Sequence, residues 1–326
     1  MTQLSRRNIL RLAAGAAALT VPARPAAALD WPTRPVHMIV PFAAGGPTDV
    51  AARIIAKSLS ERLGQSFVIE NRPGAGSNIG TEYVVRAAPD GYTLVVLGAP
   101  AAINPTLYGN LKFSATTDLV PIGGIVRVPE MMVVHPSVPA TTVPEFIAYA
   151  KAHPGKINIA AGGSGSVPDM AGALFRAMTG LDLVPVNYRG GGPALVDLLA
   201  GQVQVMFEST LIMAAQVKAG KLRALAVTTA QRSALLPDLP TVGDFVPGYE
   251  ATAWYGLAAP KGTPNEIVEK LNRELNAGLA DPGIAQKLAD LGGTPMPTTT
   301  GAFGKLLADE TERWGAVIRK FNMKAE

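Results

Sequence analysis

Residues 36–49 read VHMIVPFAAGGPTD, an apolar run followed by a glycine-containing turn and a proline. The run Val36–Val40 has the composition of a buried strand. Pro47 suits the first position of a helix, which the later apolar spacing continues at Ala51, Ile54, Ile55, Leu59 and Leu63. The stretch therefore predicts a strand, a turn and a helix, which is the repeating unit of an α/β fold.

The same unit recurs in the second half of the chain. Residues 157–168 read INIAAGGSGSVP, again a strand pattern, a glycine-rich loop and a proline near a helix start. The C-terminal third is mostly helical, with patterns over 264–280, 282–291 and 300–321. We expect this tail to pack on the first sheet, because isolated helices bury little apolar surface.

The predicted architecture is a two-lobe α/β fold in which each lobe is a mostly parallel sheet flanked by helices. Lobe 1 is expected to be discontinuous and to comprise residues 29–127 and 253–326, and lobe 2 to comprise residues 128–252. The chain would then cross between the lobes twice, near 126–128 and near 250–253. Hinged two-lobe proteins enclose a ligand in the cleft between their lobes.

The first 28 residues have the pattern of an export signal. A basic stretch with Arg6 and Arg7 precedes an apolar run over 12–21 and a small-residue cleavage pattern at 26–28. Ser5–Leu10 is similar to the twin-arginine consensus, and an ordinary secretory signal is the alternative. No cysteine follows for a lipid anchor, and no later segment is apolar enough to span a bilayer. We therefore expect a soluble protein of the Gram-negative periplasm.

The net charge and the composition exclude several classes of protein. The formal net charge of +4 comes from the four arginines of residues 1–28, since the remainder has 25 basic and 25 acidic residues. The absence of cysteine excludes thiol nucleophiles, disulfides and iron–sulfur clusters. The three histidines lie apart, and no dinucleotide-binding, P-loop or nucleophile-elbow motif is present. We expect no catalytic residue, metal, cofactor or nucleic-acid partner.

Two glycine-rich loops are the candidate binding elements. Gly45-Gly46 precedes a predicted helix, whose N-terminus offers unpaired N–H groups to an anion; a tight turn is the alternative explanation. Thr48 and Asp49 lie in its first turn, where Asp49 either contacts the ligand or only complements the helix dipole. Gly162–Ser166 is the corresponding loop of the second half. Together the loops could hold an anion without lysine or arginine. Trp254 and Tyr255 are expected in the core, with a cleft wall as the alternative.

The motifs of the chain, in order, resemble the Bug family, the periplasmic solute-binding proteins of tripartite tricarboxylate transporters. The resemblance spans residues 31–324 and is carried by Val40–Phe42, Gly45–Asp49, Arg53, Glu70–Gly76, Ala88–Leu94, Ile103–Pro105, His153–Lys156, Gly162–Ser166, Asp197–Val203, Ala219–Thr228, Leu239–Val242 and Trp254–Leu257. It implies a fold like that of periplasmic binding proteins, closing on a small carboxylate. The positions it assigns to the ligand are Phe42, Ala43, Gly46, Thr48, Asp49, Gly163, Ser164, Ser166, Asp169, Tyr188 and Gly190.

The sequence departs from the family pattern at several places near the expected cleft. Ala43-Ala44 replace commoner prolines, Asp169 stands where histidine is frequent, and Glu208-Ser209 replace an Asp-Asn pair. Ala99–Ala102 reads as a short apolar loop. Glu208 is therefore a further candidate ligand contact, and the far end of the ligand stays undetermined.

The predicted function is that of a non-catalytic, monomeric receptor that delivers an organic acid to the permease subunits of a transporter. Mono-, di- and tricarboxylates, aromatic acids included, are the candidate ligands. A ligand-binding sensor that signals to a membrane kinase and a periplasmic carboxylate-processing enzyme are the alternatives. The sensor would use the same pocket.

Overall fold

The computed structural model describes residues 30–326 except 163–164, 189, 234–235, 291 and 325–326. Within it, Pro32–Glu326 form one compact unit. The predicted export signal lies outside the described residues. Among those described, no helix combines the length and the apolar character that a membrane crossing requires.

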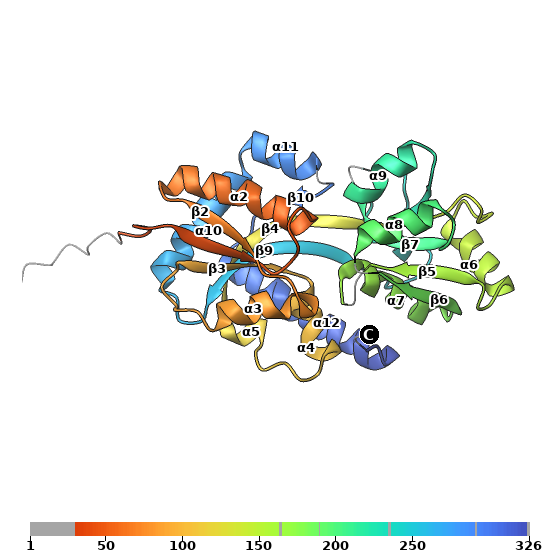
Figure 1. The fold of residues 1–326 in the computed structure, drawn as a ribbon, viewed down its shortest axis with the longest axis horizontal. Coiled ribbons are helices and arrows are strands. Elements are labelled where there is room, and N and C mark those ends of the chain that lie inside the picture. The colour runs from red at the N-terminus through yellow and green to blue at the C-terminus, as the bar shows by residue number, and fades with distance from the viewer. Residues whose placement is uncertain (1–29, 163–164, 189, 234–235, 291, 325–326) are drawn as a thin grey trace, which may run out of the picture. The chain divides into compact units, whose positions relative to one another are not determined.

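Strands and helices alternate through most of this unit (Figure 1). The strands are β1 (Val36–Val40), β2 (Phe67–Asn71), β3 (Thr93–Gly98), β4 (Leu119–Val134), β5 (Ile157–Ala161), β6 (Leu183–Asn187), β7 (Val205–Ser209), β8 (Arg223–Val227), β9 (Thr252–Pro260) and β10 (Thr294–Pro295). The α-helices are α2 (Pro47–Leu63), α3 (Asn78–Val85), α4 (Pro100–Leu107), α5 (Ala115–Asp118), α6 (Val143–Ala152), α7 (Val167–Thr179), α8 (Gly191–Leu199), α9 (Thr210–Lys218), α10 (Asn265–Leu279), α11 (Pro282–Asp290) and α12 (Thr300–Phe321). The short 3₁₀ helices are η2 (Ala75–Ser77) and η3 (Val242–Asp244).

The strand order across both lobes is β2-β1-β3-β9-β4-β7-β5-β6, with β8 and β10 also paired to β4. The outer strands β2, β1 and β3 of the first lobe are parallel, as are β6, β5 and β7 of the second. The central strands β9 and β4 are antiparallel to their neighbours. The two-lobe α/β fold is thus as predicted, and each sheet is mixed, with parallel outer strands and antiparallel central strands.

Helices cover both faces of each group of strands (Figure 1). In the first lobe α2 and α11 lie on one side, with α3, α4 and α12 on the other; in the second lobe α8 and α9 lie opposite α7. This cover explains why the inner strand β1 is largely apolar, with Met38, Ile39 and Val40 fully buried.

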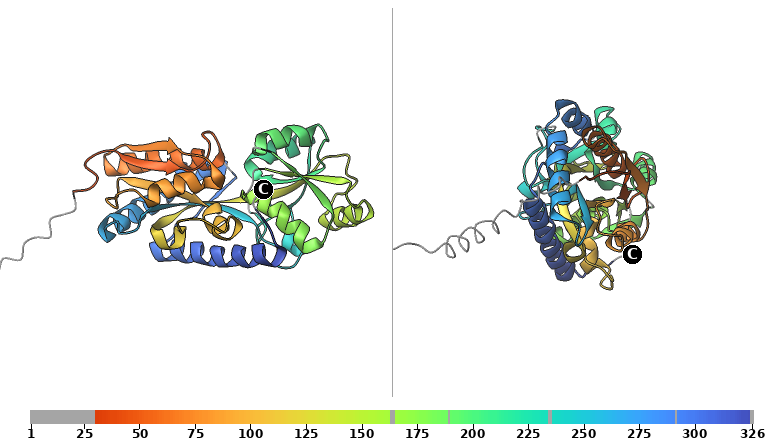
Figure 2. Two further views of the ribbon diagram at one scale, coloured as in Figure 1. Left: turned by 60° about the horizontal axis from the view of Figure 1, so that its bottom comes forward. Right: turned by 90° about the vertical axis from the view of Figure 1, so that its left-hand side faces the viewer.

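The C-terminal helices pack on the first lobe, as expected. Helix α10 contacts α2 and β4, and α12 contacts α4 and β4; Figure 2 shows α12 lying along one side of the first lobe. The Trp254 and Phe303 rings meet edge to face, with centroids 5.7 Å apart. Burying each such ring contributes roughly 1.5–3 kcal/mol, which is how the tail is held in place.

Two segments connect the lobes. Strand β4 pairs with β9 up to Pro129 and with β7 from Glu130 onward, so the change of sheet falls between these two residues. The return segment enters β9 at Thr252. Thr228 joins the two crossings, since its hydroxyl accepts from the Glu130 N–H (3.2 Å) and donates to the Ala251 carbonyl (2.5 Å). The residue numbers assigned above to each lobe stay a prediction.

One local expectation was wrong. Residues 99–102 were expected to be a loop, but Pro100 begins helix α4, with Ala99 as its N-cap residue. Alanine favours helix and proline is accepted at a first helical position, so the local sequence is compatible with this outcome.

Candidate ligand-binding site

A cavity of about 260 Å³ lies between the two lobes. Both lobes and β9 contribute to its wall. The lining residues are Phe42, Ala43, Gly46, Pro47, Thr48, Ala99, Pro100, Glu130, Gly162, Ser166, Val167, Pro168, Gly190, Gly191, Glu208, Ser209, Ile212, Ala253 and Tyr255. This volume suits a small solute rather than a nucleotide or an oligosaccharide.

Five helices begin at this cavity. The N-terminal residues of α2, α4, α7, α8 and α9 all belong to its wall. Each helix follows a strand, β1, β3, β5, β6 and β7 respectively, so the cavity lies at the carboxyl ends of those strands. This is where α/β sheets generally place their ligands. Helix N-termini carry unpaired N–H groups and partial positive charge, which favour an anion.

Seven of the twelve residues predicted to contact a ligand line the cavity: Phe42, Ala43, Gly46, Thr48, Ser166, Gly190 and Glu208. Gly163 and Ser164 lie outside the described residues. Asp49, Asp169 and Tyr188 are described but do not line the cavity.

Asp49 braces the loop in front of α2. Its Oδ2 accepts from the Gly45 N–H and from Arg53, both at 2.9 Å, and its Oδ1 accepts from Asn71 at 2.9 Å. Burial alone would raise the pKa of Asp49, but the hydrogen bonds from Arg53, Gly45 and Asn71 outweigh it and lower the pKa below its usual value. Asp49 is therefore an ionised structural group whose acceptors are already used.

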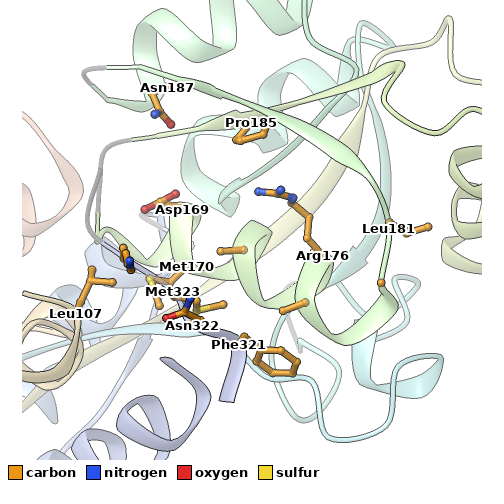
Figure 3. A pocket seen from close by; sticks show the side chains of 14 residues that line it. Leu107, Asp169, Met170, Arg176, Leu181, Pro185, Asn187, Phe321, Asn322 and Met323 are labelled. Carbon is orange, nitrogen blue, oxygen red and sulfur yellow. The ribbon is translucent and has the colours of Figure 1, made fainter. Parts of the chain in front are cut away.

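Asp169 has the equivalent place in the second lobe. Its Oδ2 accepts from the Gly165 N–H at 2.9 Å, with the same four-residue spacing as Gly45 and Asp49. It lines a different cavity, of about 660 Å³, shown in Figure 3, into which Arg176 and Asn187 also point. The carboxylate that the sequence placed near the cleft therefore lies beside the cleft loop but faces another cavity.

Tyr188 also points away from the cleft. Its hydroxyl donates to Asp197 at 2.7 Å, and its ring packs against the apolar core under α8. Its neighbour Gly190 does line the cavity, as the N-cap residue of α8.

Two buried glutamates face the cavity, and sequence reasoning identified only Glu208. Glu130 is 1% exposed and Glu208 5% exposed. Glu208 Oε1 accepts from the Ser209 N–H at 2.7 Å, and no partner is found for Glu130 Oε2 or the Ser209 hydroxyl among the described residues. An acidic residue within the otherwise apolar run Val128–Val134 was the signal that could have revealed Glu130, because unpaired carboxylates are rarely buried without a function.

Glu208 is held against the N-termini of α8 and α9. A Cβ atom on Gly191 would lie 2.1 Å from Glu208 Oε2, so the carboxyl group approaches α8 as closely as it does only because that residue is glycine. Burial raises the pKa of Glu208 to about 7, against the lowering effect of the Ser209 hydrogen bond. Burial and the nearby Glu208 raise the pKa of Glu130 well above its usual value. Both shifts favour the protonated carboxyl groups, so the pair holds protons more tightly than two exposed glutamates would.

The remaining wall of the cavity is largely apolar. Trp254 is in the core, as expected, but Tyr255 lines the cavity and hydrogen-bonds the Thr48 side chain. Of the described lining residues, none is lysine, arginine or histidine. Elsewhere in the described chain, no three histidine or acidic side chains are grouped to hold a metal ion.

Comparison with known proteins gives a consistent family assignment. The model for the Tripartite tricarboxylate transporter family receptor matches residues 51–323. BugT of Bordetella pertussis is 37% identical over 305 residues, covering 93% of this chain and 94% of BugT. The structure of the periplasmic binding protein BugD has a TM-score of 0.81 and 37% identity, covering 91% of this chain and 100% of BugD. The R. palustris protein Rpa4515, solved with adipate, has a TM-score of 0.83 and 38% identity, covering 90% and 99%.

The matching family is one of receptors and BugD is a periplasmic binding protein, in agreement with the sequence-based prediction of a binding protein rather than an enzyme. Their coverage extends over both lobes of the chain. The chain belongs to the Bug family of tripartite tricarboxylate transporter receptors.

Proposed function

We propose that this protein captures a small organic carboxylate in the cavity between its lobes and delivers it to the permease subunits of a tripartite transporter. The observation that carries the proposal is the convergence of helix N-termini on a cavity with no basic side chain among its described lining residues. The binding of adipate by Rpa4515 supports a carboxylate as the ligand class.

The helix ends can supply a useful part of the binding free energy. Glu208 faces α8 and α9, which leaves the N-termini of α2, α4 and α7 for the ligand. Each terminus contributes about 0.3–1 kcal/mol at exposed sites and up to ~2 kcal/mol when partly buried. Three termini thus contribute roughly 1–6 kcal/mol of the ~8 kcal/mol that a micromolar dissociation constant requires. Burial of the ligand's apolar part against Phe42, Pro100 and Ile212 would add the rest.

The cellular setting belongs to the same proposal. The signal pattern of residues 1–28, with its adjacent arginines, supports export to the periplasm, and BugD is a periplasmic protein. We assign lobe 1 to residues 29–127 and 253–326 and lobe 2 to residues 128–252. We also propose that the protein is a monomer, whose two lobes close on the ligand. The two crossing segments that Thr228 joins would serve as the hinge.

A thermal-shift screen tests the ligand class. The protein lacking residues 1–28, which keeps the whole compact unit, is heated with mono-, di- and tricarboxylates and aromatic acids, with sugars and metal cations as controls. A ligand at 100 times its dissociation constant should stabilise the fold by about 2.7 kcal/mol. Stabilisation by sugars or cations, with none by any acid, would overturn the proposal.

Two adjacent alanines provide a matched test of the site. Ala43 lines the cavity, whereas Ala44 is an exposed residue of the same loop that does not. Ala43→Phe should abolish binding of the acid found in the screen by filling the cavity, while Ala44→Phe should bind it normally. Equal affinities of the two variants would exclude this cavity as the site.

Delivery to a transporter is tested in cells. Deleting the gene should abolish uptake of the acid, and restoring the wild-type protein should recover it. Uptake that continues at the normal rate, together with loss of an acid-induced transcriptional response, would instead identify a sensor.

A further inference from the structure

We propose that the ligand carries a protonated amine in addition to its carboxylate, and that Glu130 and Glu208 bind this amine. The ligand would then be a zwitterion of the amino-acid type. This inference rests on the proposed function, because it assumes that a carboxylate is held at the helix N-termini.

Three buried acceptor side chains line the cavity from two paired strands. Glu130 and Glu208 lie on the paired strands β4 and β7, where Glu130 is opposite Ser209 and Met131 is opposite Glu208. Both carboxyl groups and the Ser209 hydroxyl are at least nine-tenths buried and line the cavity. Glu130 Oε2 and Ser209 Oγ have no hydrogen-bond partner among the described residues. An ammonium group has three N–H donors, which matches the two carboxyl groups and the hydroxyl.

Among the residues that the structure describes, no positive side chain lines the cavity beside the two glutamates to explain their burial. The described titratable groups that lie near enough to interact with the charge of Glu130 or Glu208 are the hydroxyls of Tyr249 and Tyr255. Both hydroxyls have a raised pKa and are therefore uncharged at neutral pH. The lining residues add no lysine, arginine or histidine in the part of the chain that the structure describes. A buried carboxylate without a counter-charge is unfavourable by several kcal/mol. A ligand ammonium would supply the missing charge.

The charge distribution of the whole cavity matches a zwitterion. The N-termini of α2, α4 and α7 present partial positive charge to the cavity, and Glu130 and Glu208 present acidic oxygens to it. A dicarboxylate would place its second carboxylate against two acidic groups, which must then both be protonated. The two ligand classes therefore require opposite proton movements: an ammonium releases a proton that the pair holds, and a second carboxylate takes up a proton.

Matched ligands test the proposal directly. Calorimetric titrations of the protein lacking residues 1–28 would compare glutarate with 4-aminobutyrate, in which one carboxylate is replaced by an ammonium on the same chain. Succinate with β-alanine, adipate with 5-aminopentanoate, and glutamate complete the panel. We expect at least one aminated acid to bind ten times more tightly than its dicarboxylate partner, with an affinity that increases from pH 6 to pH 8.

Glu208→Gln and Glu130→Gln should each reverse this preference, reducing the affinity for the aminated acid at least tenfold and leaving or improving that for the dicarboxylate. Glu61→Gln, at an exposed position of α2, is the control and should bind like the wild type. If a glutamine variant does not fold, titration of the wild type in two buffers of different ionisation enthalpy should still show proton release with the aminated acid.

The possible outcomes distinguish a failure of the amine proposal from a failure of the proposed carboxylate-receptor function. If dicarboxylates bind more tightly than every aminated partner and take up protons, the amine proposal is wrong while the carboxylate receptor stands. If the glutamine variants change both affinities equally, the glutamates have only a structural role and the proposal is again wrong. If no acid of either class binds, the proposed function itself fails.

Discussion

Replacing Gly191 with alanine tests the close approach of Glu208 to helix α8. Gly191 and Gly192 are the first two residues of this helix. A Cβ atom on Gly191 would lie 2.1 Å from Glu208 Oε2 and 2.9 Å from its Cδ, whereas a Cβ atom on Gly192 meets nothing within 4 Å. Gly191→Ala must therefore displace the Glu208 carboxyl group, and Gly192→Ala is a control in the next residue of the same turn.

The expected magnitude follows from the contacts of Glu208. Either alanine gains up to about 1 kcal/mol from helix propensity, which cancels when the two variants are compared. Displacing the carboxyl group breaks its 2.7 Å hydrogen bond from the Ser209 N–H. A hydrogen bond to a charged group contributes about 1.5–3 kcal/mol. Gly191→Ala should then unfold roughly 3–6 °C below Gly192→Ala, at about 2 °C per kcal/mol for a chain of this size.

Thermal unfolding at pH 8, where Glu208 is mostly ionised, is the assay. Because Glu208 lines the cavity, displacing its carboxyl group should also weaken ligand binding in Gly191→Ala, while Gly192→Ala should bind normally. Melting temperatures that agree within about 1 °C, well below the shift expected from one lost charged hydrogen bond, would refute the placement of Glu208 against α8.

Three further changes test other parts of the structure. Gly256→Ala places a Cβ atom 2.0 Å from the buried Phe303 ring, so it should lower the unfolding free energy by about 1–3 kcal/mol in urea titrations. Thr228→Val removes the hydroxyl between the lobe crossings and leaves the Ala251 carbonyl without that donor, which should destabilise the fold by about 1–3 kcal/mol in the same assay. Glu208 has a pKa raised from 4.5 to about 7, so the native state binds the extra proton and stability falls as pH rises through this interval. Glu208→Gln should therefore be more stable relative to wild type at pH 8 than at pH 4.5; a pH-independent difference would contradict the raised pKa.

Much of the first lobe was predictable because its signals are local. The apolar run Val36–Val40 and the proline at 47 lie within one strand and one helix start, and both elements begin where the pattern placed them. The helix 300–321 also matches its predicted limits, because apolar periodicity and capping residues mark both ends. The antiparallel pairing of β9 with β3 and β4 was not predictable, since it joins segments more than 100 residues apart.

The candidate site was likewise predictable only where its signals are local in the sequence. The turn at Gly46 and Thr48 was recognised because a glycine-containing turn before a helix is visible in the sequence. The orientation of Asp49 was not, because its partner Asn71 comes from another strand. Likewise the sequence does not indicate that Tyr255 faces a cavity while its neighbour Trp254 faces the core.

By itself, the sequence determined the α/β units, the glycine-rich turns that open the helices and the absence of cysteine chemistry, since these depend on neighbouring residues or on composition. The tertiary structure alone brought five helix N-termini and two glutamates from separate strands around one cavity. The physical reason is that strand pairing and burial, rather than local preference, determine which ends meet. Burial also raises the pKa of Glu208 from 4.5 to about 7, so a carboxyl group that would be ionised in water is partly protonated at neutral pH.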